Sequence, residues 1–293
     1  MTKSSVEISL KLSIPKIIIG MTVVSFATSA PELIVSLNAT LDGLPNFAIG
    51  NVLGSNIANI GLVLGIITII YPISLKQRFY NTDFPLLIMS TVLFYYLIYT
   101  ESQISRAEGI ILVIAITLIL FYLIFYQKND QSEFSEELDK DKISIFKSFL
   151  YILFSGSLLW LGSETLIKSA ISIAKNLEIS ERIISITMVA IGTSVPELAA
   201  SIVASLKKQN DLSIGNLIGS NIFNLLVVIG ITSSMIPING IDKSIIYNDM
   251  LWVVLFSVII LPLAYFGRKN VLTRKKGIML LALYLIFIIP LLI

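Results

Sequence analysis

The chain has 293 residues, of which 55% are hydrophobic and only 14% are charged, and its formal net charge is +2. Soluble domains are about 25% charged, and the mean hydropathy of this chain is +0.88, so the composition indicates an integral membrane protein. Cysteine and histidine are absent, which excludes disulfides, thiolate or imidazole metal sites and histidine-based catalysis. The small net charge, with basic residues scattered along the chain, gives no indication of a nucleic-acid partner.

Long apolar segments follow one another along the chain and lack the alternation of barrel strands, so we expect transmembrane helices. Lys3, Glu7 and Lys11 interrupt the N-terminal apolar residues, so a signal peptide is not expected. The nine predicted helices lie at about residues 12–37, 43–72, 83–99, 109–126, 146–167, 182–206, 211–236, 247–267 and 277–293.

Two motifs occur twice at one offset. The segment "TSAPE" at residues 28–32 matches "TSVPE" at residues 193–197, an offset of 165. At the same offset "IGNVLGSNIANI", residues 49–60, matches "IGNLIGSNIFNL", residues 214–225. Two separate motifs that share one offset without a gap indicate an internal duplication.

The duplication predicts how the chain is divided. We expect a first repeat at residues 1–126 with four helices, a polar acidic linker at 127–145 on the cytoplasmic side, and a second repeat at 146–293 with five helices. The counterpart of the helix at 146–167 would precede residue 1, so one helix of a five-plus-five plan is expected to be missing. Because each complete repeat has an odd number of helices, and basic residues concentrate in cytoplasmic loops, the second repeat is expected to be inverted relative to the first.

Each half carries a glutamate, Glu32 or Glu197, inside an apolar segment. A charged residue at the centre of a membrane helix costs about 2.5–3.5 kcal/mol on insertion scales, which implies a compensating partner. Apart from Lys16 and Arg182 at their starts, these two segments contain no Lys or Arg, so we expect that partner to be a bound cation. Residues three or four positions apart share a helix face, which places Thr28 and Ser29 beside Glu32, and Thr193 and Ser194 beside Glu197.

Other oxygen donors accompany the glutamates. The proline before each glutamate prevents a regular helix and is expected to free the backbone carbonyls of Ala27 and Gly192. Ser55 with Asn59, and Ser220 with Asn224, are spaced four residues apart in the second motif. Glycines at four-residue spacing in that motif predict closely packed helices. Carboxylate, hydroxyl and amide oxygens together suit Ca²⁺, and Na⁺ can use subsets of them, whereas Mg²⁺ fits less well. The motif also contains four asparagines that we expect to bond to neighbouring backbone, Asn51, Asn56, Asn216 and Asn221.

Both motifs resemble the α-repeats of the calcium/cation antiporters, and within them the prokaryotic sodium/calcium exchangers, over nearly the whole chain. The resemblance implies an all-α fold of two inverted five-helix repeats, here with nine helices because the first is absent. It implies Glu32 and Glu197 as shared Ca²⁺ and Na⁺ ligands. The remaining oxygens would come from Thr28, Ser29, Ser55, Thr193, Ser194 and Ser220, and from the backbone carbonyls of Ser25 and Ala190.

The chain departs from that family at two positions. Relatives often have an aspartate where this chain has Asn224, so the site has two carboxylates and the ion stoichiometry stays open. Ala27 replaces the glycine that usually precedes Thr28, so packing there is expected to differ.

The function expected on these grounds is secondary active exchange of Ca²⁺ for Na⁺ by alternating access. An empty site with two ionised glutamates is costly to move through a dry intermediate, so only the loaded carrier is expected to cross. A cation channel, a Ca²⁺/H⁺ exchanger and a K⁺-dependent exchanger are the alternatives. Enzymatic activity is not expected, because the glutamates have no nucleophile and base pair beside them. The predicted setting is the cell (inner) membrane, multi-pass in the lipid bilayer, with no cofactor and no obligate protein partner.

Overall fold

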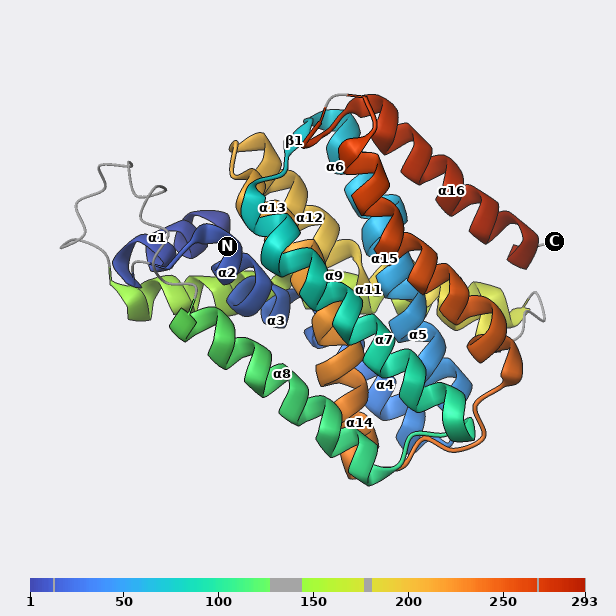
Figure 1. The fold of residues 1–293 in the computed structure, drawn as a ribbon. Helices are drawn as coiled ribbons and strands as arrows, with labels where there is room; N and C mark the ends of the chain where they lie inside the picture. Colours follow the sequence, from blue (N-terminus) through green and yellow to red (C-terminus); the bar gives the residue numbers. More distant parts are fainter. Residues whose placement is uncertain (13, 127–143, 177–180, 268, 293) are drawn as a thin grey trace.

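The computed structural model describes residues 1–12, 14–126, 144–176, 181–267 and 269–292. Nearly all of these residues are helical, and the two strands, β1 (Ile73–Ser74) and β2 (Val271–Leu272), have two residues each. Figure 1 shows a bundle of long helices, with one helix, α9, passing behind the others. The predicted linker, at residues 127–145, lies outside the described residues except for its last two positions, and α9 begins at Ile145.

In the first half, several transmembrane segments are interrupted by single π-helical turns. Its elements in chain order are α1 (Thr2–Leu12), α2 (Lys16–Ile19), the π-turn η1 (Gly20–Val24), α3 (Ser25–Thr28), α4 (Ala30–Leu41), α5 (Pro45–Ala58), η2 (Asn59–Leu64), α6 (Gly65–Ile70), β1, η3 (Phe79–Asp83), α7 (Phe84–Glu101) and α8 (Arg106–Tyr126). Such π-turns insert one extra residue into a helix and are frequent at functional sites.

The elements of the second half are α9 (Ile145–Asn176), α10 (Glu181–Ile184), η6 (Ser185–Val189), α11 (Ala190–Thr193), α12 (Val195–Leu206), α13 (Asn210–Phe223), η7 (Asn224–Val228), α14 (Ile229–Met235), η8 (Ile245–Asp249), α15 (Met250–Tyr265), β2 and α16 (Arg274–Leu292). From α2 and its counterpart α10 onward, the second half repeats the order of helices and π-turns, whereas β1 precedes η3 and β2 follows α15. From η1 to α5 each element has the same length as its counterpart 165 residues later. The duplication that was seen in the motifs therefore extends to local backbone structure.

Contacts between the halves are reciprocal. Asn56 Nδ2 donates to the carbonyl oxygen of Asn221 at 3.1 Å, and Asn221 Nδ2 donates to the carbonyl oxygen of Asn56 at 3.1 Å. The loops follow the same rule, since β1 pairs with β2 through Ile73 and Leu272, and the equivalent Ile238 pairs with Ile104. A residue pair that recurs with its roles exchanged is what an approximate two-fold axis produces.

Glycines allow the helices that carry the two motifs to approach closely. A Cβ atom on Gly54 of α5 would clash with the carbonyl oxygen of Ile186, and one on Gly219 of α13 would clash with Ser25 Oγ and Met21. These contacts join α5 to η6 and α13 to η1. The prediction that the four-residue glycine spacing marks close packing is confirmed at Gly54 and Gly219.

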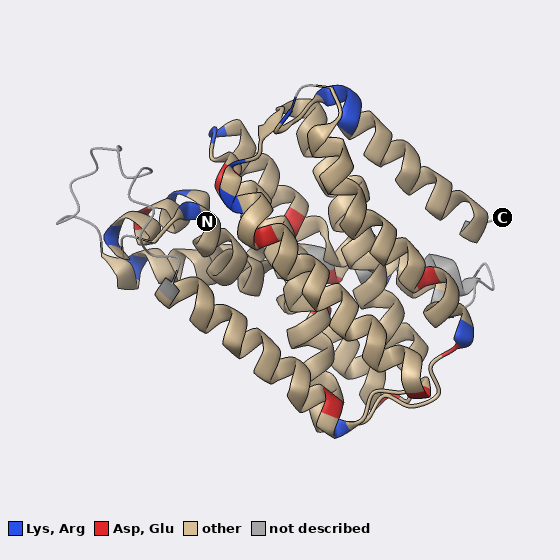
Figure 2. Cartoon of the chain, viewed as in Figure 1, with Lys and Arg blue, Asp and Glu red and all other residues tan. Residues whose placement is uncertain are grey.

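The outer helices present apolar side chains to their surroundings. Only 22% of the most apolar 18-residue stretch within Arg106–Phe125 of α8 is buried in the protein, and only 17% of Ile145–Gly162 of α9. Large exposed side chains include Leu118 and Phe125 in α8 and Phe154 in α9. Figure 2 shows that charged residues lie mainly at helix ends and in loops, while α8 and α16 are uncharged along most of their length. Such a surface suits a lipid environment.

Among the described residues, six helices are long and apolar enough to cross a membrane, or up to eight if each of two bent pairs forms one span. The predicted segment 277–293 forms α16 but is not among them, so the count of nine stays a prediction. The predicted helix at 12–37 corresponds to the bent pair Lys16–Thr28 and Ala30–Leu41, and it begins later in the chain than predicted. A separate helix, α1, precedes it, and Pro15 lies just before α2, where it cannot donate the backbone hydrogen bond that a continuous helix would need.

Candidate cation site

Each repeated "TSxPE" motif lies at a break between two helices. The segments Lys16–Thr28 and Ala30–Leu41 meet at 45°, and Ser185–Thr193 and Val195–Leu206 meet at 44°. Pro31 and Pro196 lie in the first turn of the helix that follows, where a proline needs no donor. The predicted kinks at the prolines are confirmed. Glu32 and Glu197 consequently occupy the first turns of α4 and α12, close to the break in each segment.

All twelve predicted site residues are buried, and none exposes more than 3% of its surface. They come from the breaks α3–α4 and α11–α12 and from the centres of the helices α5–η2 and α13–η7. The set consists of Ser25, Thr28, Ser29, Glu32, Ser55, Asn59, Ala190, Thr193, Ser194, Glu197, Ser220 and Asn224.

Glu197 is held by hydroxyls from both halves. Its Oε1 accepts hydrogen bonds from Ser29 Oγ at 3.0 Å and from Ser220 Oγ at 3.2 Å. Ser220 Oγ also lies 3.4 Å from Thr28 Oγ1. Oε2 of Glu197 is buried and has no hydrogen-bond partner among the described residues. The site around this carboxylate is therefore assembled across the junction of the halves.

Glu32 lacks the equivalent bonds. Both of its carboxylate oxygens are buried and have no hydrogen-bond partner within the described ranges, and the same holds for Ser194 Oγ, the counterpart of Ser29 Oγ. Ser55 Oγ instead pairs with Thr193 Oγ1 at 2.9 Å. Ser55, Thr193 and Glu197 are nevertheless near enough to act electrostatically on Glu32. The two equivalent carboxylates thus differ in hydrogen bonding, since Glu197 Oε1 accepts two hydroxyl protons and neither oxygen of Glu32 has a partner among the described residues.

Unpartnered carboxylate oxygens are costly in a buried place. Leaving a buried polar group unsatisfied costs about 1–3 kcal/mol, and more for a charged group. The ion pairs of the described residues, Lys3–Glu7, Lys76–Asp211, Arg78–Asp83 and Lys168–Glu164, do not include either glutamate. No neighbouring side chain of the described chain therefore neutralises this pair of acids.

The two asparagines predicted to face the site differ in their bonding. Asn59 Nδ2 donates to Asn221 Oδ1 at 3.0 Å, and its own Oδ1 has no partner. Neither polar atom of the Asn224 side chain has a hydrogen-bond partner among the described residues. Asn59 and Asn224 therefore offer amide oxygens that no other group in the described part of the protein uses.

Backbone carbonyls near the breaks are partly occupied. The Ser25 carbonyl accepts from Ser29 N at 2.8 Å, and the Ala190 carbonyl accepts from Ser194 N at 3.1 Å. Each also lies within reach of a threonine hydroxyl, that of Thr28 at 3.3 Å or that of Thr193 at 3.2 Å. Ser55 Oγ also lies 3.5 Å from the Ala190 carbonyl oxygen. Because a carbonyl oxygen has two lone pairs, each of these carbonyls can accept a further partner only when the neighbouring hydroxyls direct their protons elsewhere.

The sequence prediction missed part of this polar network. Asn51 and Asn216 were expected to bond to neighbouring backbone, yet their Oδ1 atoms accept from Thr193 at 3.3 Å and from Thr28 at 3.2 Å, in the opposite half. Their Nδ2 atoms donate to the serine hydroxyls of Ser36 and Ser201, each at 3.0 Å. The repetition of these asparagines in both motifs was the available signal.

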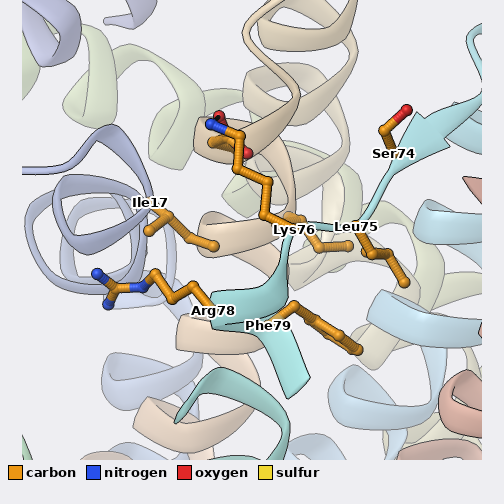
Figure 3. Close-up of a pocket in the computed structure, with 8 residues that line it drawn as sticks. Ile17, Ser74, Leu75, Lys76, Arg78 and Phe79 are labelled. Atoms are coloured by element: carbon orange, nitrogen blue, oxygen red, sulfur yellow. Dashed lines mark ion pairs between the residues drawn. The ribbon is translucent and has the colours of Figure 1, made fainter. Parts of the chain in front are cut away.

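A second group of charges lies away from the glutamates, beside a shallow pocket (Figure 3). Lys76 Nζ lies 2.9 Å from Asp211 Oδ2 and joins the loop after β1 to the first turn of α13. Arg78 Nε lies 3.4 Å from the buried Asp83 Oδ1 within the first half. The pocket is lined by Ile17, Ser74, Leu75, Lys76, Arg78, Phe79, Asp211 and Ile214. The Lys76–Asp211 pair therefore links the two halves, and the Arg78–Asp83 pair lies within the first half. Neither pair includes Glu32 or Glu197.

The donor set at the glutamates consists of oxygen alone. Among the described residues there is no group of three or more His, Cys, Asp or Glu side chains that could hold a metal ion. Two carboxylates with hydroxyl, amide and carbonyl oxygens suit hard alkali or alkaline-earth cations.

A membrane-type helical fold with a buried, oxygen-lined site between two repeated halves defines a membrane transporter. The family model described as "Sodium/calcium exchanger protein" matches residues 1–125 and 147–292. The chain therefore belongs to the sodium/calcium exchanger family, the antiporter family expected from its motifs, and it is a transporter and not an enzyme.

Similar proteins agree with this assignment. The putative antiporter CaxA of Alkalimonas amylolytica is 34% identical over 95% of this chain and 89% of its own length. The inner membrane protein YrbG of Escherichia coli is 32% identical over 94% of this chain and 86% of its own length. A solved structure of the sodium-calcium exchanger NCX_Mj superposes with a TM-score of 0.79 and 30% identity, covering 98% of this chain and 91% of that one.

Proposed function

We propose that this protein exchanges Ca²⁺ for Na⁺ across the membrane by alternating access, with Glu32 and Glu197 as ligands shared by the two ions. The observation that carries the proposal is the pair of buried glutamates, one from each half, with three of their four carboxylate oxygens unpartnered among the residues that the structure describes. Two negative charges in a site that lacks a protein counter-charge are best compensated by a cation. Membership of the sodium/calcium exchanger family supports this choice of ions.

The proposed ligands follow from the unpartnered oxygens and their neighbours. Around Glu32 and Glu197 the hydroxyls of Thr28, Ser29, Ser55, Thr193, Ser194 and Ser220, the side-chain oxygens of Asn59 and Asn224, and the carbonyls of Ser25 and Ala190 supply more donors than one ion needs. Ca²⁺ takes six to eight oxygens in flexible geometry. Several Na⁺ ions can instead occupy different subsets of the same oxygens.

Charge explains why the transport would be an exchange. With both glutamates ionised, the empty site carries two negative charges, and their burial in a closed, dry intermediate is expensive. One Ca²⁺, or at least two Na⁺, removes most of that penalty. The loaded carrier can therefore change its access while the empty one cannot, and each ion must return in exchange for the other. Exchange of three Na⁺ for one Ca²⁺ would move one net charge per cycle.

The repeat supplies two equivalent half-sites for alternating access. Hydrogen bonds that recur with exchanged roles, such as Asn56 with Asn221, relate residues 1–126 to residues 146–293. We take the second half to be inverted, with the site near the middle of the bilayer and the linker at 127–145 on the cytoplasmic side, as in transporters built from inverted repeats. In such a carrier, a shift of one half against the other would open the site to one side at a time. The name of YrbG favours the inner membrane as its location.

The test is ⁴⁵Ca²⁺ uptake into vesicles that contain the purified protein. Vesicles loaded with Na⁺ should take up Ca²⁺ when diluted into Na⁺-free buffer, and vesicles loaded with choline should not. Uptake that instead follows an imposed pH gradient would indicate Ca²⁺/H⁺ exchange, and uptake that requires K⁺ together with Na⁺ would indicate a K⁺-dependent exchanger. Ca²⁺ flux that needs no counter-ion gradient would favour a channel and contradict the proposal.

A further inference from the structure

Two buried asparagines outside the proposed ligand set connect its threonines to the rest of the fold. Asn51 belongs to α5 in the first half, and its Oδ1 accepts a hydrogen bond from Thr193 Oγ1 in α11 of the second half at 3.3 Å. Its Nδ2 donates to Ser36 Oγ in α4 at 3.0 Å and to the Glu32 carbonyl at 3.4 Å. One amide therefore contacts both sides of the site.

The same arrangement is built a second time. Asn216 of α13 accepts from Thr28 Oγ1 of the first half at 3.2 Å and donates to Ser201 Oγ of α12 at 3.0 Å. Both asparagines are at most 1% exposed. The two networks consist of different residues, yet in both the asparagine accepts from a threonine of the opposite half and donates to a serine of its own half. The arrangement is therefore not an accident of one side chain.

The serine that accepts from the Asn51 amide nitrogen determines which way round the Asn51 amide lies. Ser36 Oγ donates its single proton to the Ala48 carbonyl at 3.2 Å, so it can only accept from Asn51 Nδ2. The amide nitrogen of Asn51 is therefore directed at Ser36, and its oxygen is left to face Thr193. An oxygen in that position can accept the threonine proton but cannot donate one.

The direction of the Asn51 amide matters because the threonine hydroxyl has a single proton and can donate it to only one acceptor. Thr193 Oγ1 lies within hydrogen-bond distance of Asn51 Oδ1 at 3.3 Å, of the Ala190 carbonyl at 3.2 Å and of Ser55 Oγ at 2.9 Å. When Ser55 donates to Thr193, the threonine proton goes to Asn51 Oδ1 or to the Ala190 carbonyl. A cation bound beside Thr193 needs a lone pair of the hydroxyl and repels its proton. With Asn51 as the acceptor, the proton points away from the ion and the Ala190 carbonyl is released to act as a ligand.

We infer that Asn51 and Asn216 are positioning residues for the transported cation: each accepts the hydroxyl proton of the threonine in the opposite half, and so turns the threonine oxygen toward the ion. This inference rests on the proposed function. The asparagines act through Thr193 and Thr28 and do not contact the ion. Their loss should lower ion affinity only as long as those threonine hydroxyls are present.

A double-mutant cycle on the full-length purified protein tests the inference, with equilibrium ⁴⁵Ca²⁺ binding and its competition by Na⁺ as the readout. Asn51→Leu keeps the approximate volume and should weaken Ca²⁺ binding about five- to tenfold, the loss expected for one net hydrogen bond. Thr193→Val should weaken it by a similar factor or more. The double variant should bind no more than about twofold more weakly than Thr193→Val alone, because the asparagine then has no proton to accept.

Asn56→Leu is the matched control. Asn56 is an equally buried asparagine on the same helix, and it bonds to the Asn221 backbone instead of a threonine. If the two positions act independently, the loss of Ca²⁺ affinity in the Asn56→Leu/Thr193→Val double variant should equal the product of the two single fold-changes. Ser36→Ala supplies a milder perturbation: it should weaken binding about two- to threefold, and it should have no further effect in the Asn51→Leu protein.

The outcomes separate the two proposals. Wild-type protein without saturable Ca²⁺ binding that Na⁺ displaces would contradict the proposed function, and this inference with it. Wild-type binding combined with independent, multiplying effects of Asn51→Leu and Thr193→Val would contradict the inference alone. If Asn51→Leu does not fold, the cycle of Ser36→Ala with Thr193→Val decides, because a positioning role again predicts that the serine effect disappears in the valine background.

Discussion

Asn56 and Asn221, which are equivalent positions in the two halves, each donate a hydrogen bond to the other's backbone carbonyl at 3.1 Å. Both side chains are at most 1% exposed. Because each asparagine plays the same role toward the other, the approximate two-fold axis that relates the halves passes between them. The proposed ion site lies on the same helices, so the pair holds together the two parts that, in the proposed mechanism, shift against each other during transport.

We predict that Asn56→Ala lowers the stability of the protein without removing ion binding. The change leaves the Asn221 carbonyl without its donor in a buried place, and this should cost about 1–3 kcal/mol. The measurement is thermal unfolding of the purified protein in detergent. Asn81→Ala is the control, since Asn81 is exposed and its loss should change stability by at most about 0.5 kcal/mol. Equal unfolding temperatures for the two variants would show that the pair does not stabilise the junction.

Glu32→Gln and Glu197→Gln are each expected to abolish Ca²⁺ exchange. Either change removes one of two charges from the proposed site with little change in volume, so one Ca²⁺ would leave the site positively charged instead of neutral. Counterflow of ⁴⁵Ca²⁺ against Na⁺ in vesicles measures the effect. Glu101→Gln, at an exposed position, should exchange normally. Normal exchange by either glutamine variant, at equal insertion, would remove the central claim about the site.

The side chain of Asn224 has no hydrogen-bond partner among the described residues, and we predict that Asn224→Asp makes transport more sensitive to protons. An aspartate would place a third acid near two carboxylates, and a proton bound there competes with the metal ion. Exchange by the variant should match that of the wild type at pH 9 and fall below it as the pH decreases to 6. A flat pH profile combined with tighter Ca²⁺ binding would mean that the added acid stays ionised, and that residue 224 does not lie beside the glutamates in the working protein.

Gly54→Ala should disrupt the packing of α5 against η6. The added Cβ atom would clash with the backbone carbonyl of Ile186 and lie 2.6 Å from Ala190 Cβ, and such overpacking costs about 1–3 kcal/mol. Since Ala190 is a proposed carbonyl ligand, exchange should fall together with stability. Gly162→Ala in α9 is the control: a Cβ atom there meets nothing within 4 Å, so it should stabilise the helix by up to about 1 kcal/mol. The reverse order of stabilities would contradict the packing shown by the structure.

The ion pair of Lys76 and Asp211 joins the halves at the edge of the pocket in Figure 3. The lysine side chain is 53% exposed and the aspartate 23%, so solvent screens the pair and Asp211→Asn should cost only about 0–1 kcal/mol. Its contribution should shrink as salt is raised from 0.05 to about 1 M, because the screening length falls to roughly 3 Å. Unfolding of wild type and variant at both salt concentrations provides the measurement. A large difference that persists in high salt would show a buried, structural pair instead.

The amino-acid order by itself determined the class of this protein, because membrane insertion depends on local properties that a sequence displays directly. Apolar segments of sufficient length, acids placed within them and prolines before those acids predicted a helical membrane protein, the kinks at Pro31 and Pro196 and a buried oxygen site. Two motifs at one offset revealed the duplication, since a repeat is visible without any knowledge of how its copies pack.

Only the tertiary structure decided which oxygens meet, because each half-site is completed by residues about 140 to 190 positions away in the chain. Ser29 Oγ bonds to Glu197 while its counterpart Ser194 Oγ has no partner in the described part of the chain, an asymmetry that two nearly identical motifs cannot express. The roles of Asn51 and Asn216 were likewise hidden. An amide has both donor and acceptor atoms, and which of them faces a threonine is determined by the serine that the fold places at its other end.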